Sequence, residues 1–231
     1  MQGPLVYEPT AKRVARALMA AGAYCLATDM SNKATWFTWK SKIRAPVYTD
    51  CRVLARDPGA TALITTAMGS AIRAIYPDVE YIVGIAEAGV VWSTLTSREL
   101  GRPQAFVRRE PKQHGRSGLI ECSPPSGVRA VVVDDVMASG GSVEKAISVL
   151  KAEKQITTIG VQTIANWNFR EMRERFARIG VPVRSLVSFP ELLEAAQDAH
   201  LITDAAGKEL QRFYRNPHEH KWSLETLRKA A

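Results

Sequence analysis

Apolar and polar residues alternate along the chain in two different rhythms. Short apolar runs, which indicate buried strands, take turns with longer stretches in which apolar residues recur every three or four positions, as in amphipathic helices. The pattern predicts strands at 81–86, 104–109, 130–136, 158–166 and 183–189. It predicts helices at 89–100, 142–153, 169–180 and 190–199. This regular alternation favours an α/β fold with a parallel sheet that helices cover on both faces.

The first third of the chain is less regular. Its apolar spacing predicts a helix over 10–28 and extended segments over 34–54. An aspartate and a proline then open a predicted helix over 57–75, because aspartate caps a helix and proline suits its first turn. No linker or repeat interrupts the 231 residues, so we expect a single domain, 1–231.

Ligands of parallel sheets bind beyond the carboxyl ends of the strands. Four segments follow predicted strands at that edge, namely Ala86 to Gly89, Arg108 to Gly118, Asp134 to Ser142 and Asn166 to Phe169. We expect the functional residues to lie in these segments.

One of these segments combines paired negative charge with small residues. The apolar run 130–133 ends at two adjacent carboxylates, Asp134 and Asp135, and the small residues 138–142 precede a helix. Free N–H groups at a helix start favour an anion such as phosphate, whereas carboxylates suit hydroxyl groups or a cation. A sugar phosphate satisfies both, and neither common nucleotide-binding glycine motif is present. Alternatively, the two aspartates only cap the turn.

Positive charge gathers in another of the segments. The chain has a formal net charge of +8. The stretch 101–118 contains Arg102, Arg108, Arg109, Lys112, His114 and Arg116 against the single acid Glu110. An anionic partner is expected, and nucleic acid is the common case. A solvated loop without a binding role is the alternative.

Cysteine usage and hydropathy indicate the compartment. The cysteines Cys25, Cys51 and Cys122 are widely spaced and form no C-x-x-C pair. The N-terminus has no secretory signal pattern, and the longest apolar stretch, 17–27, is too short to span a bilayer. We therefore expect a cytoplasmic protein without a membrane partner.

Several segments resemble the motifs of one enzyme family. The stretch VVVDDVMASGGS resembles the phosphoribosyl-pyrophosphate (PRPP) motif of type I phosphoribosyltransferases. Three further stretches are similar to segments of orotate phosphoribosyltransferases: FTWKSKIRAPVYTDCR on the substrate side, FVRREPKQHG in the catalytic loop and GIAEAGV in the pyrophosphate loop. The C-terminal FYRNPHEHKW is also similar, so the likeness extends over about residues 30–222.

The resemblance implies a role for individual residues. Asp134 and Asp135 would bind the ribose hydroxyl groups and, with Lys112 and His114, form the catalytic set. The PRPP site would also include Arg108, Arg109, Val136, Met137, Ala138, Ser139, Gly140, Gly141 and Ser142, together with Ala86, Glu87, Ala88 and Gly89 of the pyrophosphate loop. The orotate side would comprise Lys40, Tyr48 and Ala138.

The resemblance also implies an architecture and partners. The fold would be that of type I phosphoribosyltransferases, with residues 1–55 and the C-terminal tail forming a hood on the substrate side. The cofactor would be Mg²⁺, held mainly by PRPP, with no protein ligand assigned. The enzyme would be a homodimer in which the loop 108–118 acts in the neighbouring site.

Four positions depart from the family pattern. Ala138 stands where threonine is usual, Arg109 replaces a common lysine, and Lys42 replaces a glycine. Trp167 takes the place of a tyrosine found in one branch. The resemblance is therefore weakest at the base pocket.

The resemblance implies transfer of the phosphoribosyl group of PRPP to orotate, which gives orotidine 5′-monophosphate and pyrophosphate in pyrimidine biosynthesis. Nucleic acid is not expected as a partner on this interpretation. One alternative is a phosphoribosyltransferase for another base, and a second is a regulator that senses PRPP and binds nucleic acid.

Overall fold

The chain divides into two compact units. The computed structural model describes residues 10–27, 29, 32–39, 42–111 and 118–218. One unit comprises Met1–Leu54 with Pro190–Ala231, and the other comprises Ala55–Phe189. A single domain with a hood formed by residues 1–55 and the C-terminal tail stays a prediction.

A six-stranded sheet forms the centre of the unit Ala55–Phe189. Its strands are β5 (Tyr81–Ile85), β6 (Gln104–Val107), β7 (Ile120–Glu121), β8 (Arg129–Met137), β9 (Thr157–Asn166) and β10 (Val183–Ser188). They lie in the order β10-β9-β8-β5-β6-β7, and all neighbours are parallel except β6 and β7. The predicted parallel sheet is confirmed, and the short antiparallel strand β7 is an addition to it.

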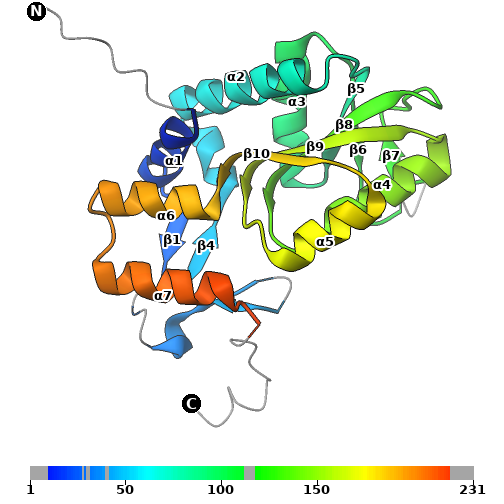
Figure 1. Cartoon of the computed structure of the whole chain (residues 1–231). Helices are drawn as coiled ribbons and strands as arrows, with labels where there is room; N and C mark the ends of the chain where they lie inside the picture. Colours follow the sequence, from blue (N-terminus) through cyan, green and yellow to red (C-terminus); the bar gives the residue numbers. More distant parts are fainter. Residues whose placement is uncertain (1–9, 28, 30–31, 40–41, 112–117, 219–231) are drawn as a thin grey trace, which may run out of the picture. The chain divides into compact units, whose positions relative to one another are not determined.

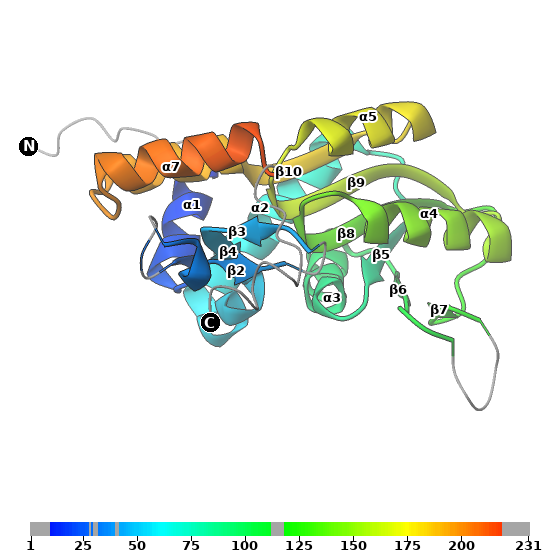
Figure 2. The same cartoon turned by 90° about the horizontal axis from the view of Figure 1, so that it is seen from below.

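Helices cover both faces of this sheet, as the sequence predicts. They are α2 (Pro58–Ile75), α3 (Ala88–Leu100), α4 (Gly141–Lys154) and α5 (Arg170–Ile179). Figures 1 and 2 show α2 and α3 on one face and α4 and α5 on the other. The core between the sheet and α4 and α5 contains Val83, Val132 and Val161 with Leu150 and Phe176. Apolar residues on both faces of the strands therefore account for their continuous apolar runs.

Helix α2 begins where the sequence predicts. The Oδ1 atom of Asp57 accepts hydrogen bonds from the backbone N–H groups of Gly59 and Ala60, at 2.8 and 3.1 Å. Pro58 occupies the first turn, where its missing N–H group costs no helical hydrogen bond. The predicted aspartate cap is confirmed.

The sheet order determines where the functional segments meet. Because β5, β6, β8 and β9 are parallel neighbours, their carboxyl ends lie along one edge. The segments that follow these strands therefore share that edge, which is where ligands bind in open α/β sheets.

The other unit combines short strands with three helices in its described part. Its elements are α1 (Thr10–Ala20), β1 (Tyr24–Leu26), the 3₁₀ helix Lys33–Thr35, β2 (Phe37–Thr38), β3 (Arg44–Ala45), β4 (Val47–Thr49), α6 (Phe189–Asp198) and α7 (Asp204–Arg215). A second 3₁₀ helix, Cys51–Arg56, crosses the boundary between the units. β1 pairs with β4 and β2 with β3, both antiparallel. The aromatic rings of Trp36 and Trp39 each meet Phe213 edge to face, so α7 contributes to the core of this unit.

The prediction of one helix over 10–28 is wrong at its C-terminal end. α1 stops at Ala20, and Gly22 adopts a left-handed φ of 70°. The N–H groups of Gly22 and Ala23 return to the carbonyl oxygens of Met19 and Leu18. This glycine C-cap ends the helix, and the chain leaves it as β1.

None of the described helices is long and apolar enough to cross a membrane.

Candidate active site

The acidic pair lies at the carboxyl end of β8, in the interior of the sheet. The strand continues to Met137, so both aspartates lie within it, and Asp134 is in register with Thr163 of β9. The backbone N–H of Asp135 donates a 3.0 Å hydrogen bond to Asp134 Oδ1. Asp134 is half-buried, and Asp135 is only 9% exposed. Two poorly hydrated carboxylates are therefore adjacent at the ligand-binding edge.

The environment of Asp134 favours its protonated form. Burial is the largest cause of a pKa raised well above the ordinary value, and the negative charge of Asp135 adds to it. The Arg109 guanidinium acts in the opposite direction and lowers this pKa. The pair therefore gains from any partner that supplies positive charge or hydroxyl donors.

Residues 138–140 of the segment 138–142 join β8 to α4, and residues 141–142 form the start of that helix. α4 begins at Gly141, and no side chain caps its N-terminus at Gly140. Gly140 has φ 75°, and a Cβ there would lie 2.5 Å from Cε2 of Phe176. Only glycine fits both the backbone conformation and the packing against α5. The predicted phosphate loop thus has uncapped N–H groups and a rigid support.

The segment 86–89 lies directly beside the acidic pair. A Cβ on Gly89 would lie 2.8 Å from the carbonyl oxygen of Val133 and 3.0 Å from Asp134 Oδ1. Glycine therefore allows α3 to begin against the end of β8. Arg109 Nε donates a 2.9 Å hydrogen bond to the carbonyl oxygen of Ala86. The structure brings together three segments that the sequence singles out.

The two arginines that open the basic segment, residues 108–118, have different surroundings. Arg109 contacts the segment 86–89 and acts on Asp134, as described above. Arg108 instead forms an ion pair with Glu121 of β7 at 3.1 Å, and its Nε donates to the carbonyl oxygen of Glu110 at 3.2 Å. Lys112 and His114, to which the resemblance gives catalytic roles, lie outside the described residues.

The residues expected on the orotate side belong partly to the other unit. Lys40 lies outside the described residues. Tyr48 is half-buried in β4, where its ring lies 5.8 Å from that of Phe37. Ala138 follows β8 and brings no hydroxyl group to the phosphate loop. Their roles stay predictions.

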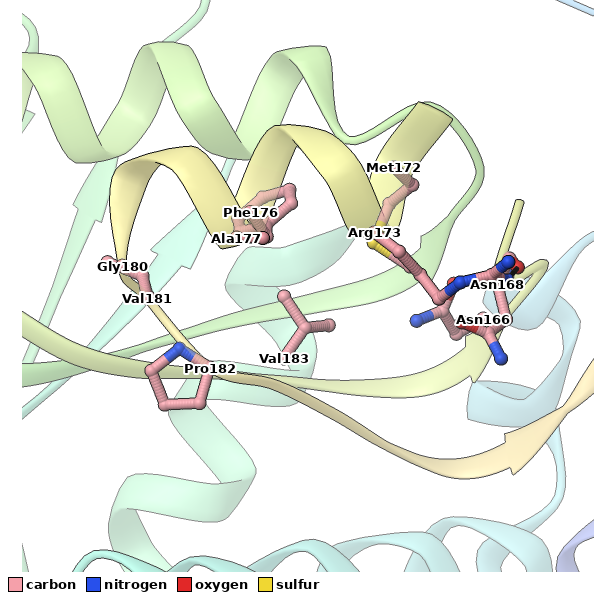
Figure 3. Close-up of a pocket in the computed structure, with 10 residues that line it drawn as sticks. All are labelled: Asn166, Asn168, Met172, Arg173, Phe176, Ala177, Gly180, Val181, Pro182 and Val183. Atoms are coloured by element: carbon pink, nitrogen blue, oxygen red, sulfur yellow. Dashed lines mark hydrogen bonds between the residues drawn. The ribbon is translucent and has the colours of Figure 1, made fainter. Parts of the chain in front are cut away.

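A cavity of about 430 Å³ opens beside the carboxyl end of β9. Figure 3 shows a polar end, formed by Asn166, Asn168 and Arg173, and an apolar part that includes Phe176 and Val183. Asn166 Oδ1 accepts a 2.7 Å hydrogen bond from the N–H of Asn168, and Arg173 donates to the carbonyl oxygen of Asn168. Because Phe176 also supports Gly140, the cavity and the phosphate loop share one wall.

Some residues that shape the site are not evident from the sequence. Lys145 and Glu153 of α4 contact the two ends of the segment 109–119. Phe176 supports the phosphate loop from α5. The sequence pattern places these residues on predicted helices. It does not show which residues they contact, because those contacts form only when the helices pack on the folded sheet.

Comparisons with known proteins agree with this geometry. A family model for the phosphoribosyl transferase domain matches residues 54–193. The chain belongs to the phosphoribosyltransferase family. This phosphoribosyltransferase is 34% identical over 193 residues to the orotate phosphoribosyltransferase of Cutibacterium acnes, a match that covers 84% of this chain and 87% of that protein. The predicted family membership is confirmed.

Solved structures of related enzymes have the same fold. The orotate phosphoribosyltransferase from Aeropyrum pernix is 28% identical and superposes with a TM-score of 0.69 over 80% of this chain and 98% of that chain. The Leishmania donovani UMP synthase superposes with a TM-score of 0.76 at 21% identity, over 89% of this chain and 42% of that one. The predicted type I phosphoribosyltransferase fold is confirmed.

Phosphoribosyltransferases generally use Mg²⁺ with PRPP. No group of three or more metal-binding side chains occurs among the described residues. Mg²⁺ commonly keeps several waters and binds through one or two carboxylates and substrate phosphates. A cation near Asp134 and Asp135 would also relieve the repulsion between them. The donor set therefore fits Mg²⁺ that is held largely by the substrate.

Proposed function

We propose that this phosphoribosyltransferase transfers the phosphoribosyl group of PRPP to orotate, giving orotidine 5′-monophosphate and pyrophosphate. One observation carries the proposal: Asp134, the segment 86–89 and Arg109 contact one another at the edge where β8 leads into the uncapped start of α4. Acids for ribose hydroxyls, N–H groups for phosphate and a cation for pyrophosphate are thus combined at one edge. The curated relatives named orotate phosphoribosyltransferase support orotate as the base.

The chemistry requires stabilisation of opposite charges. The bond from C1′ of ribose to the pyrophosphate oxygen breaks, and a bond from C1′ to a ring nitrogen of orotate forms. That nitrogen loses its proton, which passes to the departing pyrophosphate or to solvent. Positive charge develops on the ribose while negative charge develops on the departing pyrophosphate. Fixed cations near the departing oxygens lower the barrier, and removal of one such donor commonly costs about 2.7–4 kcal/mol in other enzymes.

The described residues divide this work. Asp134 and Asp135 accept hydrogen bonds from the ribose hydroxyls. The N–H groups of Gly141 and Ser142, at the start of α4, bind the 5′-phosphate. Arg109 and the N–H groups of the segment 86–89 face the pyrophosphate. Mg²⁺, when bound, supplies further positive charge at the pyrophosphate and ribose oxygens.

We further propose that the enzyme is a cytoplasmic homodimer. The basic loop 108–118 would act in the site of the neighbouring subunit through Lys112 and His114. Lys40 and Tyr48 would bind orotate. The family resemblance in the segments FVRREPKQHG and FTWKSKIRAPVYTDCR supports these assignments.

Turnover with defined bases tests the proposal. The absorbance of orotate should fall in the presence of PRPP and Mg²⁺, and pyrophosphate should appear in equal amount. Adenine, hypoxanthine and uracil serve as matched controls and should give no comparable turnover. Faster turnover with a purine would remove orotate as the substrate while leaving PRPP in place.

A further inference from the structure

One side of α4 faces the basic segment of the site. Lys145, Val149 and Glu153 are spaced four residues apart, so they lie along the same side of the helix. The helix begins at Gly141, directly after the phosphate loop. α4 therefore connects the phosphate loop to the chain segments that contact this side of the helix.

Glu153 contacts the chain where the basic segment ends. Both carboxylate oxygens of Glu153 lie 3.2 Å from the backbone nitrogen of Leu119 and accept its N–H. The carbonyl oxygen of Leu119 accepts a 2.8 Å hydrogen bond from the N–H of Arg108. The backbone of Leu119 is thus held on one side by α4 and on the other by the chain that continues β6.

Gly118 leaves room for the carboxylate of Glu153 because it has no side chain. It adopts φ 124°, and a Cβ there would lie 3.1 Å from Oε2 of Glu153. A side chain would be strained at this φ and would crowd the carboxylate. The local backbone is therefore adapted to the approach of Glu153.

Lys145 contacts the chain where the basic segment starts. Its Nζ donates a 3.4 Å hydrogen bond to the carbonyl oxygen of Arg109. The ion pair between Arg108 and Glu121 joins the same two chain ends across β6 and β7. Lys145 and Glu153 are eight positions apart on the helix, which corresponds to an axial rise of about 12 Å. α4 thus forms hydrogen bonds with the backbone at both ends of the basic segment, at Arg109 and at Leu119.

We propose that Glu153, assisted by Lys145, is a positioning residue that fixes Arg109 and Leu119 relative to the phosphate loop. This inference rests on the proposed function, because its consequence is correct placement of the pyrophosphate-binding segment when the 5′-phosphate occupies the start of α4. In this arrangement neither side chain is assigned a contact with substrate. Each acts through the backbone of the segment to which that contact is assigned.

Three variants test the role of Glu153. Glu153→Ala removes the acceptor of the Leu119 N–H, whereas Glu153→Gln keeps an amide oxygen that can accept it. Lys151→Ala alters an exposed residue on the same helix and is the matched control. Hydrogen exchange at the Leu119 amide should accelerate about tenfold in Glu153→Ala and remain near the wild-type rate in Glu153→Gln and Lys151→Ala.

Kinetics then separate positioning from stability. In Glu153→Ala, kcat/KM for PRPP should fall about tenfold, which corresponds to about 1.4 kcal/mol. The KM for orotate and the melting temperature of Glu153→Ala should stay close to the wild-type values. Glu153→Gln should keep most of the wild-type kcat/KM for PRPP. Faster exchange at Leu119 without a change in PRPP kinetics would overturn the inference, as would unchanged exchange. If the wild-type enzyme does not consume orotate, the proposed function fails separately, because the exchange measurement requires no turnover.

Discussion

Arg109 Nε donates a 2.9 Å hydrogen bond to the carbonyl oxygen of Ala86, which links the start of the basic segment to the loop between β5 and α3. The same guanidinium lowers the pKa of Asp134 against the larger effect of burial. One side chain therefore holds the loop proposed to bind pyrophosphate and also influences the acid proposed to bind ribose. Its removal should affect PRPP more than orotate.

Arg109→Gln should lower kcat/KM for PRPP about 100-fold, because it removes a fixed cation at the departing pyrophosphate. Arg109→Lys should fall between wild type and Arg109→Gln, since lysine keeps the charge but not the planar geometry. Steady-state kinetics with each substrate varied in turn provide the measurement. Arg102→Gln, at an exposed position in the same basic stretch, is the control and should be close to wild type. A loss confined to the KM for orotate would place Arg109 on the base side instead.

Asp134→Asn should make the protein more stable at neutral pH while lowering activity. The pKa of Asp134 is raised in the folded state, mainly by burial. Between the unfolded value, about 3.9, and the folded value, the folded state keeps a proton that the unfolded state has lost. Stability therefore falls as pH rises through this window and stays reduced above it. Asparagine does not titrate, so the variant avoids this loss.

The melting temperature of Asp134→Asn should exceed that of wild type at pH 7, by about 2–4 °C for each kcal/mol gained. The difference should shrink as the pH falls toward about 4. Glu194→Gln, an exposed acid-to-amide change, is the control and should leave the melting temperature close to that of wild type. A variant that is less stable than wild type at every pH would contradict the argument.

Gly140→Ala should destabilise the protein by about 1–3 kcal/mol. The new Cβ would lie 2.5 Å from the Phe176 ring, and φ 75° is unfavourable for alanine. Gly141→Ala is a matched stability control, because nothing lies within 4 Å of the Cβ position there. Denaturant unfolding measures both changes. Phe176→Leu should recover part of the loss in Gly140→Ala, and a Gly140→Ala variant as stable as Gly141→Ala would show that the loop tolerates a side chain.

The sequence predicts the unit Ala55–Phe189 well because its strands are buried on both faces and its helices are amphipathic, so each element has a local pattern. The end of α1 is less accessible to such reasoning, since an apolar run continues past the glycine C-cap at Gly22. The sequence pattern does not predict α7, although Thr203 caps it by accepting a hydrogen bond from the N–H of Ala206. In the site, the segments that carry motifs are predictable. The contact between Glu153 and Leu119 is not, because it joins elements 34 residues apart that meet only in the folded sheet.

Mixed dimers test whether two subunits share each site. If Lys112 acts in the neighbouring site while Asp135 binds ribose in its own, Lys112→Ala and Asp135→Asn should each be nearly inactive as pure dimers. In a hybrid, one site receives both changes and the other receives neither. Random exchange of equal amounts makes about half of the dimers hybrid, so about one quarter of all sites should be intact in a two-fold assembly.

Activity should therefore recover to about one quarter of the wild-type value per site after the two variants are unfolded and refolded together. A tag on one variant shows by co-purification that subunits have exchanged. Mixing of wild type with an equal amount of Asp135→Asn is the control, because there every wild-type half-site finds an intact Lys112 and about half of the sites should be active. If the exchanged mixture of the two variants stays as inactive as its parents, Lys112 serves its own subunit or neither, and the shared-site assignment fails.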